Sequence, residues 1–207
     1  MYRVLIVEND PLAIQLFTMF LEGHPKYQIV ASLESAAFAE NYCKRNPVDL
    51  ILMDICTDLG ASGLEAASRI KKNKPSIKII IITSQPECSY IDRAKEGAID
   101  SFWYKIVKEV ELIEVMDRTM AGESIYPDTT PQISIGYAIS GEFTPRELEV
   151  LRELTSGDTN TEIAERLGLS SITVRNHIKN MLEKTGFKSR TSLAVAAGKS
   201  GLVNRDY

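Results

Sequence analysis

The chain has 207 residues, of which 44% are hydrophobic and 25% charged, with a formal net charge of −4. These values are ordinary for a soluble globular protein and leave room for one large domain or two small ones. The net negative charge excludes a nucleic-acid-binding protein that is basic along its whole length. No apolar run approaches the ~20 residues of a membrane span. The N-terminus lacks signal-peptide architecture, and the three cysteines have no metal-ligand or redox spacing. We therefore expect a cytoplasmic protein with reduced thiols and no membrane partner.

Residues 1–121 alternate strand-like and helix-like segments. The expected strands are residues 4–7, 29–31, 50–53, 77–83 and 101–103. Residues 50–53 and 79–82 are continuously apolar, which is typical of strands buried on both faces of a parallel sheet. Five β/α repeats in this length predict an α/β, doubly wound domain with the flavodoxin-like strand order.

Polar side chains end or follow four of these strands, where a doubly wound sheet binds its ligands. They are Glu8, Asn9, Asp10, Asp54, Thr83 and Lys105. Clustered carboxylates repel one another unless a cation lies between them, and Mg²⁺ is the usual cation with oxygen ligands. A carboxylate beside Mg²⁺ and a lysine can act as a nucleophile toward a phosphoryl group. Capping of the next helix is an equally good explanation for Asp10.

Residues 122–141 contain no basic residue and several turn formers, so we expect a linker. After it, residues 142–207 change to short helices with strong start signals. Thr144 and Glu147 form one capping-box pattern, with Pro145 at the first helical position. Thr159 and Glu162 form a second.

Residues 161–186 have the pattern of a helix-turn-helix. Gly168 ends a first helix at a position where a left-handed residue costs least, and Ser170 can cap the next. In that next helix, which we expect to begin at Ser171, an apolar stripe recurs at helical spacing. The stripe consists of Val174, Ile178, Met181 and Leu182.

Opposite this stripe, Arg175, Asn176 and Lys179 are expected to face outward, near the helix end that contacts base edges in the major groove. Further basic residues are expected to hold the DNA backbone, namely Lys184, Lys188 and Arg190. Residues 171–190 hold five basic residues and one acidic residue. Taken alone, a basic helix face is equally well explained as a solvated surface.

Together, residues 143–151 (FTPRELEVL), 160–167 (NTEIAERL) and 173–177 (TVRNH) resemble the LuxR-type helix-turn-helix. The resemblance covers nearly all of 142–207 and implies an all-α, four-helix domain that binds double-stranded DNA as a homodimer. The dimer contact would lie on the last helix, roughly residues 190–199. Its expected contact positions are Leu193, Ala194 and Ala197.

Residues 4–12 (VLIVENDPL), 49–54 (DLILMD), 82–84 (ITS) and the stretch from Gly97 to Lys105 resemble the receiver domain of response regulators. With the C-terminal domain, this implies a two-component transcription regulator of the NarL/FixJ class rather than an enzyme. A sensor histidine kinase is the implied partner, and RNA polymerase is a further candidate. By position, Asp54 is the phosphoacceptor, and Thr83, Phe102 and Lys105 form the switch. The Mg²⁺ ligands are Glu8, Asn9, Asp54 and the Cys56 carbonyl.

Two departures from the receiver pattern leave alternatives open. Most members have aspartate where this chain has the neutral Asn9, so Mg²⁺ should bind more weakly. The loop after Asp54 is one residue longer, with Thr57 and Asp58 in unusual positions and its glycine at Gly63. Phosphorylation of Asp54 is the leading hypothesis. A receiver that ignores phosphate and dimerises constitutively is the alternative. A metal-dependent phosphohydrolase is disfavoured, because no second acid–base carboxylate follows Asp54 at the short interval such chemistry uses.

Overall fold

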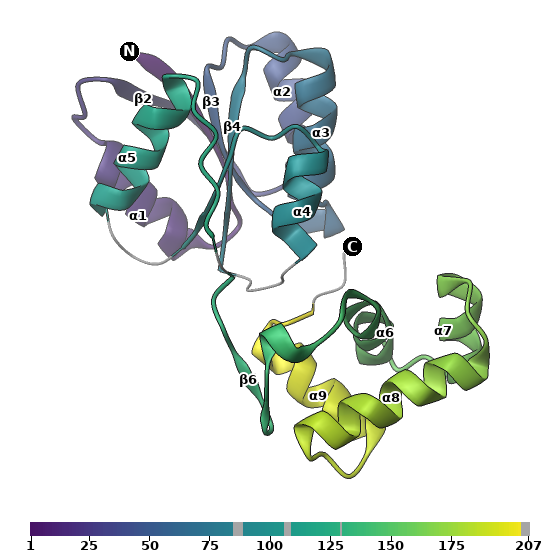
Figure 1. Cartoon of the computed structure of the whole chain (residues 1–207). Helices are drawn as coiled ribbons and strands as arrows, with labels where there is room; N and C mark the ends of the chain where they lie inside the picture. Colours follow the sequence, from purple (N-terminus) through teal and green to yellow (C-terminus); the bar gives the residue numbers. More distant parts are fainter. Residues whose placement is uncertain (85–88, 106–108, 129, 204–207) are drawn as a thin grey trace. The chain divides into compact units, whose positions relative to one another are not determined.

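The computed structural model describes residues 1–84, 89–105, 109–128 and 130–203, so the last four residues of the predicted DNA-binding domain lie outside it. The chain forms two compact units, one ending at Asp128 and one beginning after it (Figure 1). Each unit is described by itself. Among the described residues, none of the helices combines the length and apolar character that a membrane span requires.

A five-stranded parallel sheet forms the centre of the first unit, in the order β2-β1-β3-β4-β5. Its strands are β1 (Tyr2–Val7), β2 (Tyr27–Leu33), β3 (Leu50–Asp54), β4 (Lys78–Thr83) and β5 (Ser101–Tyr104). This is the predicted flavodoxin-like order, and every residue of β3 is buried. Continuous apolar runs are therefore explained by cover on both faces of the sheet.

Helices cover both faces of this sheet (Figure 1). One face packs against α1 (Pro11–Leu21) and α5 (Glu109–Met120) through residues such as Val4 and Ile6. The other packs against α2 (Ala39–Arg45), α3 (Gly63–Asn73) and α4 (Ser89–Glu96) through residues such as Leu5 and Val7. Two short 3₁₀ turns, η1 (Ala36–Phe38) and η2 (Asp58–Gly60), complete the unit.

The predicted linker 122–141 is divided between the two units. In the first, the Phe102 amide donates a hydrogen bond of 2.8 Å to the Ile125 carbonyl. The Tyr126 hydroxyl donates one of 2.7 Å to the Ile99 carbonyl, and its ring packs against the core. The chain after α5 therefore lies along β5. This segment was predicted to be a linker because it contains turn-forming residues and shows no apolar periodicity.

The second part of the predicted linker is a hairpin in the second unit, with strands β6 (Ser134–Ile135) and β7 (Ala138–Ile139). Ile135 and Ala138 are buried in that unit's core. The Tyr137 amide donates to the Thr185 carbonyl at 3.0 Å, so the hairpin holds the end of a helix. Strands of two residues are too short to show the alternation that predicts a strand.

Four helices form the rest of the second unit, as predicted: α6 (Pro145–Thr155), α7 (Asn160–Leu167), α8 (Ser171–Thr185) and α9 (Arg190–Ser200). The short turn η3 (Ser140–Glu142) precedes them. Both predicted capping boxes are present, at Thr144 and Thr159. Gly168 ends α7 in the left-handed conformation, with φ of 64°. Local capping chemistry therefore sets the bounds of these helices.

Candidate functional site

Four strand ends meet in one crevice of the first unit. Asp54 is the last residue of β3, and Glu8 directly follows β1. Thr83 ends β4, and its carbonyl accepts a hydrogen bond of 2.8 Å from the amide of Lys105, which follows β5. The sheet topology thus brings together residues that lie far apart in the sequence.

Two buried carboxylates share one ammonium in this crevice. The Lys105 Nζ lies 2.5 Å from Glu8 Oε2 and 3.3 Å from Asp54 Oδ1. Glu8 is fully buried and Asp54 is 6% exposed. When both carboxylates are ionised, Lys105 balances only one of them, and the crevice then has a net negative charge.

This environment changes the acidity of Asp54. Burial raises its pKa to about 7, opposed by the positive charge of Lys105 and assisted by the negative charge of Glu8. The ionised carboxylate is therefore held in a state of high free energy. Groups perturbed in this way by burial and a neighbouring charge are concentrated at functional sites.

Of the predicted metal ligands, Glu8 and Asp54 lie in this crevice, Asn9 follows Glu8 in the chain, and Cys56 lies two residues after Asp54. The possible donors are the carboxylates of Glu8 and Asp54, the Asn9 amide and the Cys56 carbonyl, and all of these supply oxygen. A net negative, all-oxygen set fits Mg²⁺. Within the described residues, no group of three or more His, Cys, Asp or Glu side chains could hold a metal. Any site here therefore depends on the amide and the backbone as well as on carboxylates.

Asp10 has the capping role that the sequence left open. Its Oδ1 accepts a hydrogen bond of 2.9 Å from the Leu12 amide at the start of α1. Its own amide donates to Glu8 Oε1 at 3.0 Å. Asp10 thus fixes the start of α1 and orients Glu8.

The predicted switch residues lie on neighbouring strands. Thr83 is fully buried at the end of β4. Phe102 is buried on the α2–α4 face, where its ring meets Tyr104 edge-on, with centroids 5.1 Å apart. Through the Ile125 bond described above, the backbone of Phe102 is also joined to the segment that leaves the first unit.

Gly63 explains how the longer loop returns to the site. A Cβ on Gly63 would lie 1.8 Å from the Asp54 carbonyl oxygen. The Gly63 amide donates to the Ile55 carbonyl at 2.8 Å. Only glycine allows α3 to begin this close to the end of β3.

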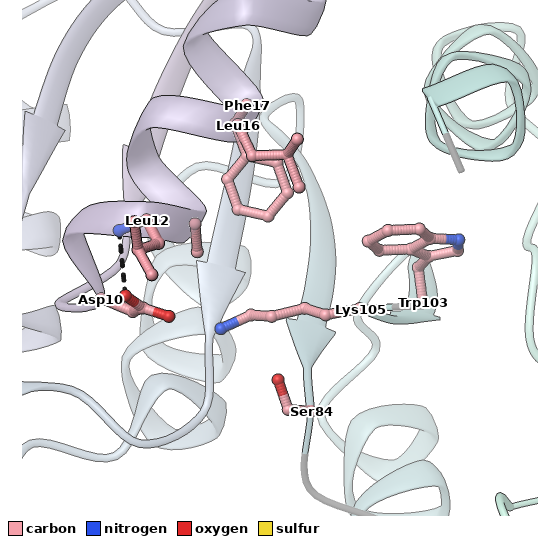
Figure 2. Close-up of a pocket in the computed structure, with 8 residues that line it drawn as sticks. Asp10, Leu12, Leu16, Phe17, Ser84, Trp103 and Lys105 are labelled. Atoms are coloured by element: carbon pink, nitrogen blue, oxygen red, sulfur yellow. Dashed lines mark hydrogen bonds between the residues drawn. The ribbon is translucent and has the colours of Figure 1, made fainter. Parts of the chain in front are cut away.

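A pocket of about 220 Å³ adjoins the crevice between α1 and the end of β5. Figure 2 shows the Lys105 side chain extending toward Asp10, with Trp103 on the opposite side of the pocket. Apolar side chains from α1, including Leu12 and Phe17, form much of its wall. Leu12 is 75% exposed, so an apolar surface lies directly beside the ionic site.

The second unit presents the predicted reading face of α8. Val174, Ile178 and Met181 are buried. The side chains opposite are exposed, namely Arg175, Asn176 and Lys179. Sequence reasoning missed Ile172, which is 66% exposed and lies on the same face, three and four residues before Arg175 and Asn176. Its helical spacing from those residues was the available signal.

Two of the predicted backbone-contacting residues are engaged inside the unit. Lys184 Nζ lies 2.7 Å from Glu147 Oε2 and 2.8 Å from the Glu142 carbonyl. Arg190 donates to Asn160 Oδ1 at 3.1 Å and to the Asp158 carbonyl. Both cations therefore hold helices together. Lys188, by contrast, is exposed.

The predicted dimer positions need correction. Leu193 and Ala197 have no exposed surface and pack in the core of the second unit. Ala194 is partly buried against the same core. These residues face inward because α9 packs on α6 and α8, so in this fold Leu193 and Ala197 are not surface contacts. The exposed face of α9 carries Val195, which is 50% exposed.

Comparison with known families agrees with both units. The response regulator receiver domain matches residues 4–117, more than half of the chain. The luxR family of bacterial regulatory proteins matches residues 142–197. The receiver match corresponds to the first compact unit and the luxR match to the second. Residues 118–141, between the two matches, are covered by neither.

Individual relatives extend over both units. The Fimbriae Z protein of Escherichia coli K12 is 29% identical over 92% of this chain and 93% of its own length. The response regulator VraR of Staphylococcus aureus is 28% identical over 97% and 98%. RcsB of Salmonella enterica serovar Typhimurium, solved bound to a promoter with the phosphomimetic BeF₃⁻, has a TM-score of 0.61 at 21% identity, over 96% and 98%. The chain thus belongs to the two-component response regulators of the NarL/FixJ class, transcription regulators that join a receiver to a LuxR-type DNA-binding domain.

Proposed function

We propose that phosphorylation of Asp54 by a partner histidine kinase controls DNA binding by this regulator. The observation that carries the proposal is the buried Asp54 carboxylate, which shares Lys105 with Glu8 at the carboxyl ends of the strands. A carboxylate oxygen of Asp54 would attack the phosphoryl group as its bond to the kinase breaks. Lys105 would then balance the charge that the phosphoryl oxygens bring.

Mg²⁺ would be held by Glu8, Asn9, Asp54 and the Cys56 carbonyl. When bound, it neutralises phosphoryl oxygens and orients the transferred group. The high pKa of Asp54 supports a need for further positive charge, because Lys105 alone leaves the ionised carboxylate unfavourable. The apolar surface of α1 beside the crevice, with Leu12 at its edge, is a suitable contact for the kinase that approaches Asp54.

The switch would connect this chemistry to the rest of the chain. A phosphoryl group on Asp54 offers new acceptors to the Thr83 hydroxyl, and movement of Thr83 changes the space available to Phe102. The backbone of Phe102 is bonded to Ile125 in the segment that leads to the second unit. A shift between two receiver states would therefore alter that segment.

In the DNA-binding domain, Arg175, Asn176 and Lys179 would read base edges, while Lys188 contacts phosphates. Lys184 and Arg190 are assigned to structural roles by their internal bonds. RcsB has been solved as two dimers bound to two DNAs. A homodimer on DNA is the corresponding proposal here, with the outer face of α9 around Val195 as its contact.

The test is phosphorylation of the full chain by acetyl phosphate with Mg²⁺, read by intact mass spectrometry, followed by measurement of operator affinity. We expect one added phosphoryl group on the wild type and none on Asp54→Ala, with tighter operator binding by the phosphorylated form. Full labelling of Asp54→Ala would contradict the site assignment.

A phosphate-independent receiver is the second candidate, favoured by the neutral Asn9 and by the cation that Lys105 already supplies to Glu8. In that case the domain would dimerise constitutively. Beryllium fluoride with Mg²⁺ distinguishes the two, since operator affinity unchanged by this phosphoryl mimic would support the second candidate.

A further inference from the structure

The loop after Asp54, which is one residue longer than the receiver pattern, contains one tight turn, η2. Leu59 and Gly60 both adopt the left-handed conformation there, with φ of 61° and 64°. A leucine in this region is uncommon and costs free energy, so the surrounding structure must enforce the turn. Leu59 is 76% exposed, which shows that packing of its side chain is not the reason.

The backbone of Asp58, the first residue of this turn, is fixed from two sides. Its amide donates to the Glu34 carbonyl at 3.0 Å, and its carbonyl accepts from Ser35 Oγ at 2.6 Å. The preceding residue, Thr57, is buried and bonds both the Ala36 amide and the Ala61 carbonyl. Hydrogen bonds to the Asp58 backbone and to Thr57 therefore fix the position of the turn. The exposed Asp58 side chain is placed by the turn and not by packing of its own.

The fixed Asp58 side chain meets the non-consensus residue of the metal site. Asn9 Nδ2 donates a hydrogen bond of 2.8 Å to Asp58 Oδ1. A carboxylate can only accept, so the Asn9 amide must present its nitrogen to Asp58. The amide oxygen, on the other branch of the same planar group, stays available as a ligand. Without Asp58, nothing in this contact would distinguish the two orientations of the amide.

Asp58 also changes the charge at this point. Asn9 is neutral where the receiver pattern has an aspartate, and Glu8 and Asp54 already share Lys105. A carboxylate one hydrogen bond from Asn9 returns a negative charge to the neighbourhood of the missing one. Partners of this kind, which orient a ligand, contribute strongly to metal affinity.

We propose that Asp58 is a positioning residue for the divalent-cation site: it turns the Asn9 amide oxygen toward the crevice and supplies the charge that an aspartate at position 9 would carry. The inference rests on the proposed Mg²⁺ site. The longer loop and the substitution at position 9 are then two parts of one arrangement, because Asp58 lies in that loop and accepts the hydrogen bond from Asn9.

Calorimetric titration of Mg²⁺ into the full chain at pH 8 tests this role directly. We expect Asp58→Ala to weaken Mg²⁺ binding about tenfold. Asp58→Asn should weaken it less, because its amide oxygen still accepts from Asn9. Glu22→Ala removes an exposed carboxylate at the far end of α1 and should leave the dissociation constant unchanged. Melting temperatures measured alongside report that each variant is folded.

A second pair of variants separates charge and orientation from a merely structural role. Asn9→Asp alone places two carboxylates at hydrogen-bond distance, whereas Asn9→Asp combined with Asp58→Asn restores one acid and one amide in exchanged positions. We expect the double variant to bind Mg²⁺ at least as tightly as the wild type. Wild-type affinity in Asp58→Ala would overturn the role of Asp58. Absence of Mg²⁺ binding by the wild type would instead overturn the metal site of the proposed function, and this inference with it.

Discussion

The receiver crevice and the reading face of α8 use charge in opposite ways. In the crevice, Asp54 and Glu8 are buried around Lys105, so each charge depends on its neighbours. On α8, Arg175 and Lys179 are exposed, and Lys179 Nζ lies 3.6 Å from the exposed Glu183 Oε1. Buried charges respond strongly to proton, cation and phosphoryl group. Exposed charges are screened and act mainly on a charged partner such as DNA.

The largest expected effect comes from a glycine-to-alanine substitution behind the phosphoacceptor, compared with the same substitution in the second unit. Gly63→Ala places a methyl group 1.8 Å from the Asp54 carbonyl oxygen, so backbone must move at the phosphoacceptor. We expect a loss of about 3 kcal/mol in the free energy of unfolding, measured by urea denaturation. Gly141→Ala is the matched control in the second unit, where a Cβ would meet nothing within 4 Å. Equal stability of the two variants would contradict the tight packing behind Asp54.

Two lysines of α8 separate structural charge from DNA-binding charge. Lys184→Ala leaves the buried Glu147 without its ammonium, and we expect a loss of about 2 kcal/mol in unfolding free energy. The bonds from Lys184 and Thr144 hold the pKa of Glu147 below its usual value although burial opposes this. Lys179→Ala should instead keep the stability, weaken operator binding and lower its salt dependence, because one exposed positive charge is lost from the reading face. If Lys184→Ala kept its stability and lost operator affinity, while Lys179→Ala lost stability, the structural role assigned to Lys184 would be wrong.

The pH dependence of stability tests the buried crevice. The pKa of Asp54 is about 7 in the folded chain against an ordinary 3.8, so between these values the unfolded chain has released a proton that the folded chain keeps. Wild-type stability therefore falls as the pH rises through this window. Asp54→Asn does not titrate, and its advantage over the wild type should grow by about 2–3 kcal/mol from pH 5 to pH 8. Thermal unfolding without divalent cations measures this difference. A constant difference across the window would show that Asp54 is not held in a high-energy ionised state.

Much of the fold and of both sites could be predicted because their signals are local. Continuous apolar runs predicted the strands, and the patterns at Thr144 and Thr159 predicted the helix starts. The parts that could not be predicted depend on contacts between distant residues. Asn9 and Asp58 are 49 positions apart, and Glu147 and Lys184 are 37 apart.

The inward direction of Leu193 and Ala197 shows the same limit. Helical spacing predicts that both lie on one face of α9, but it does not say whether that face meets the domain's own core or a second chain. Only the packing of α9 against its neighbours decides this. Small apolar residues suit either environment, so composition gave no further help.

Ile172 provides the finest test of the reading face, because an exposed apolar side chain beside Arg175 and Asn176 is suited to the methyl group of a thymine. Ile172→Ala should lower affinity for the preferred operator about fivefold, corresponding to about 1 kcal/mol, without changing the salt dependence. Selection from a random DNA pool should then recover a weaker preference for thymine at one position of each half-site. Replacing that thymine by deoxyuridine removes only the methyl group, and should abolish the difference between the wild type and Ile172→Ala. A difference that persisted on deoxyuridine DNA would mean that Ile172 supports the helix rather than reading a base.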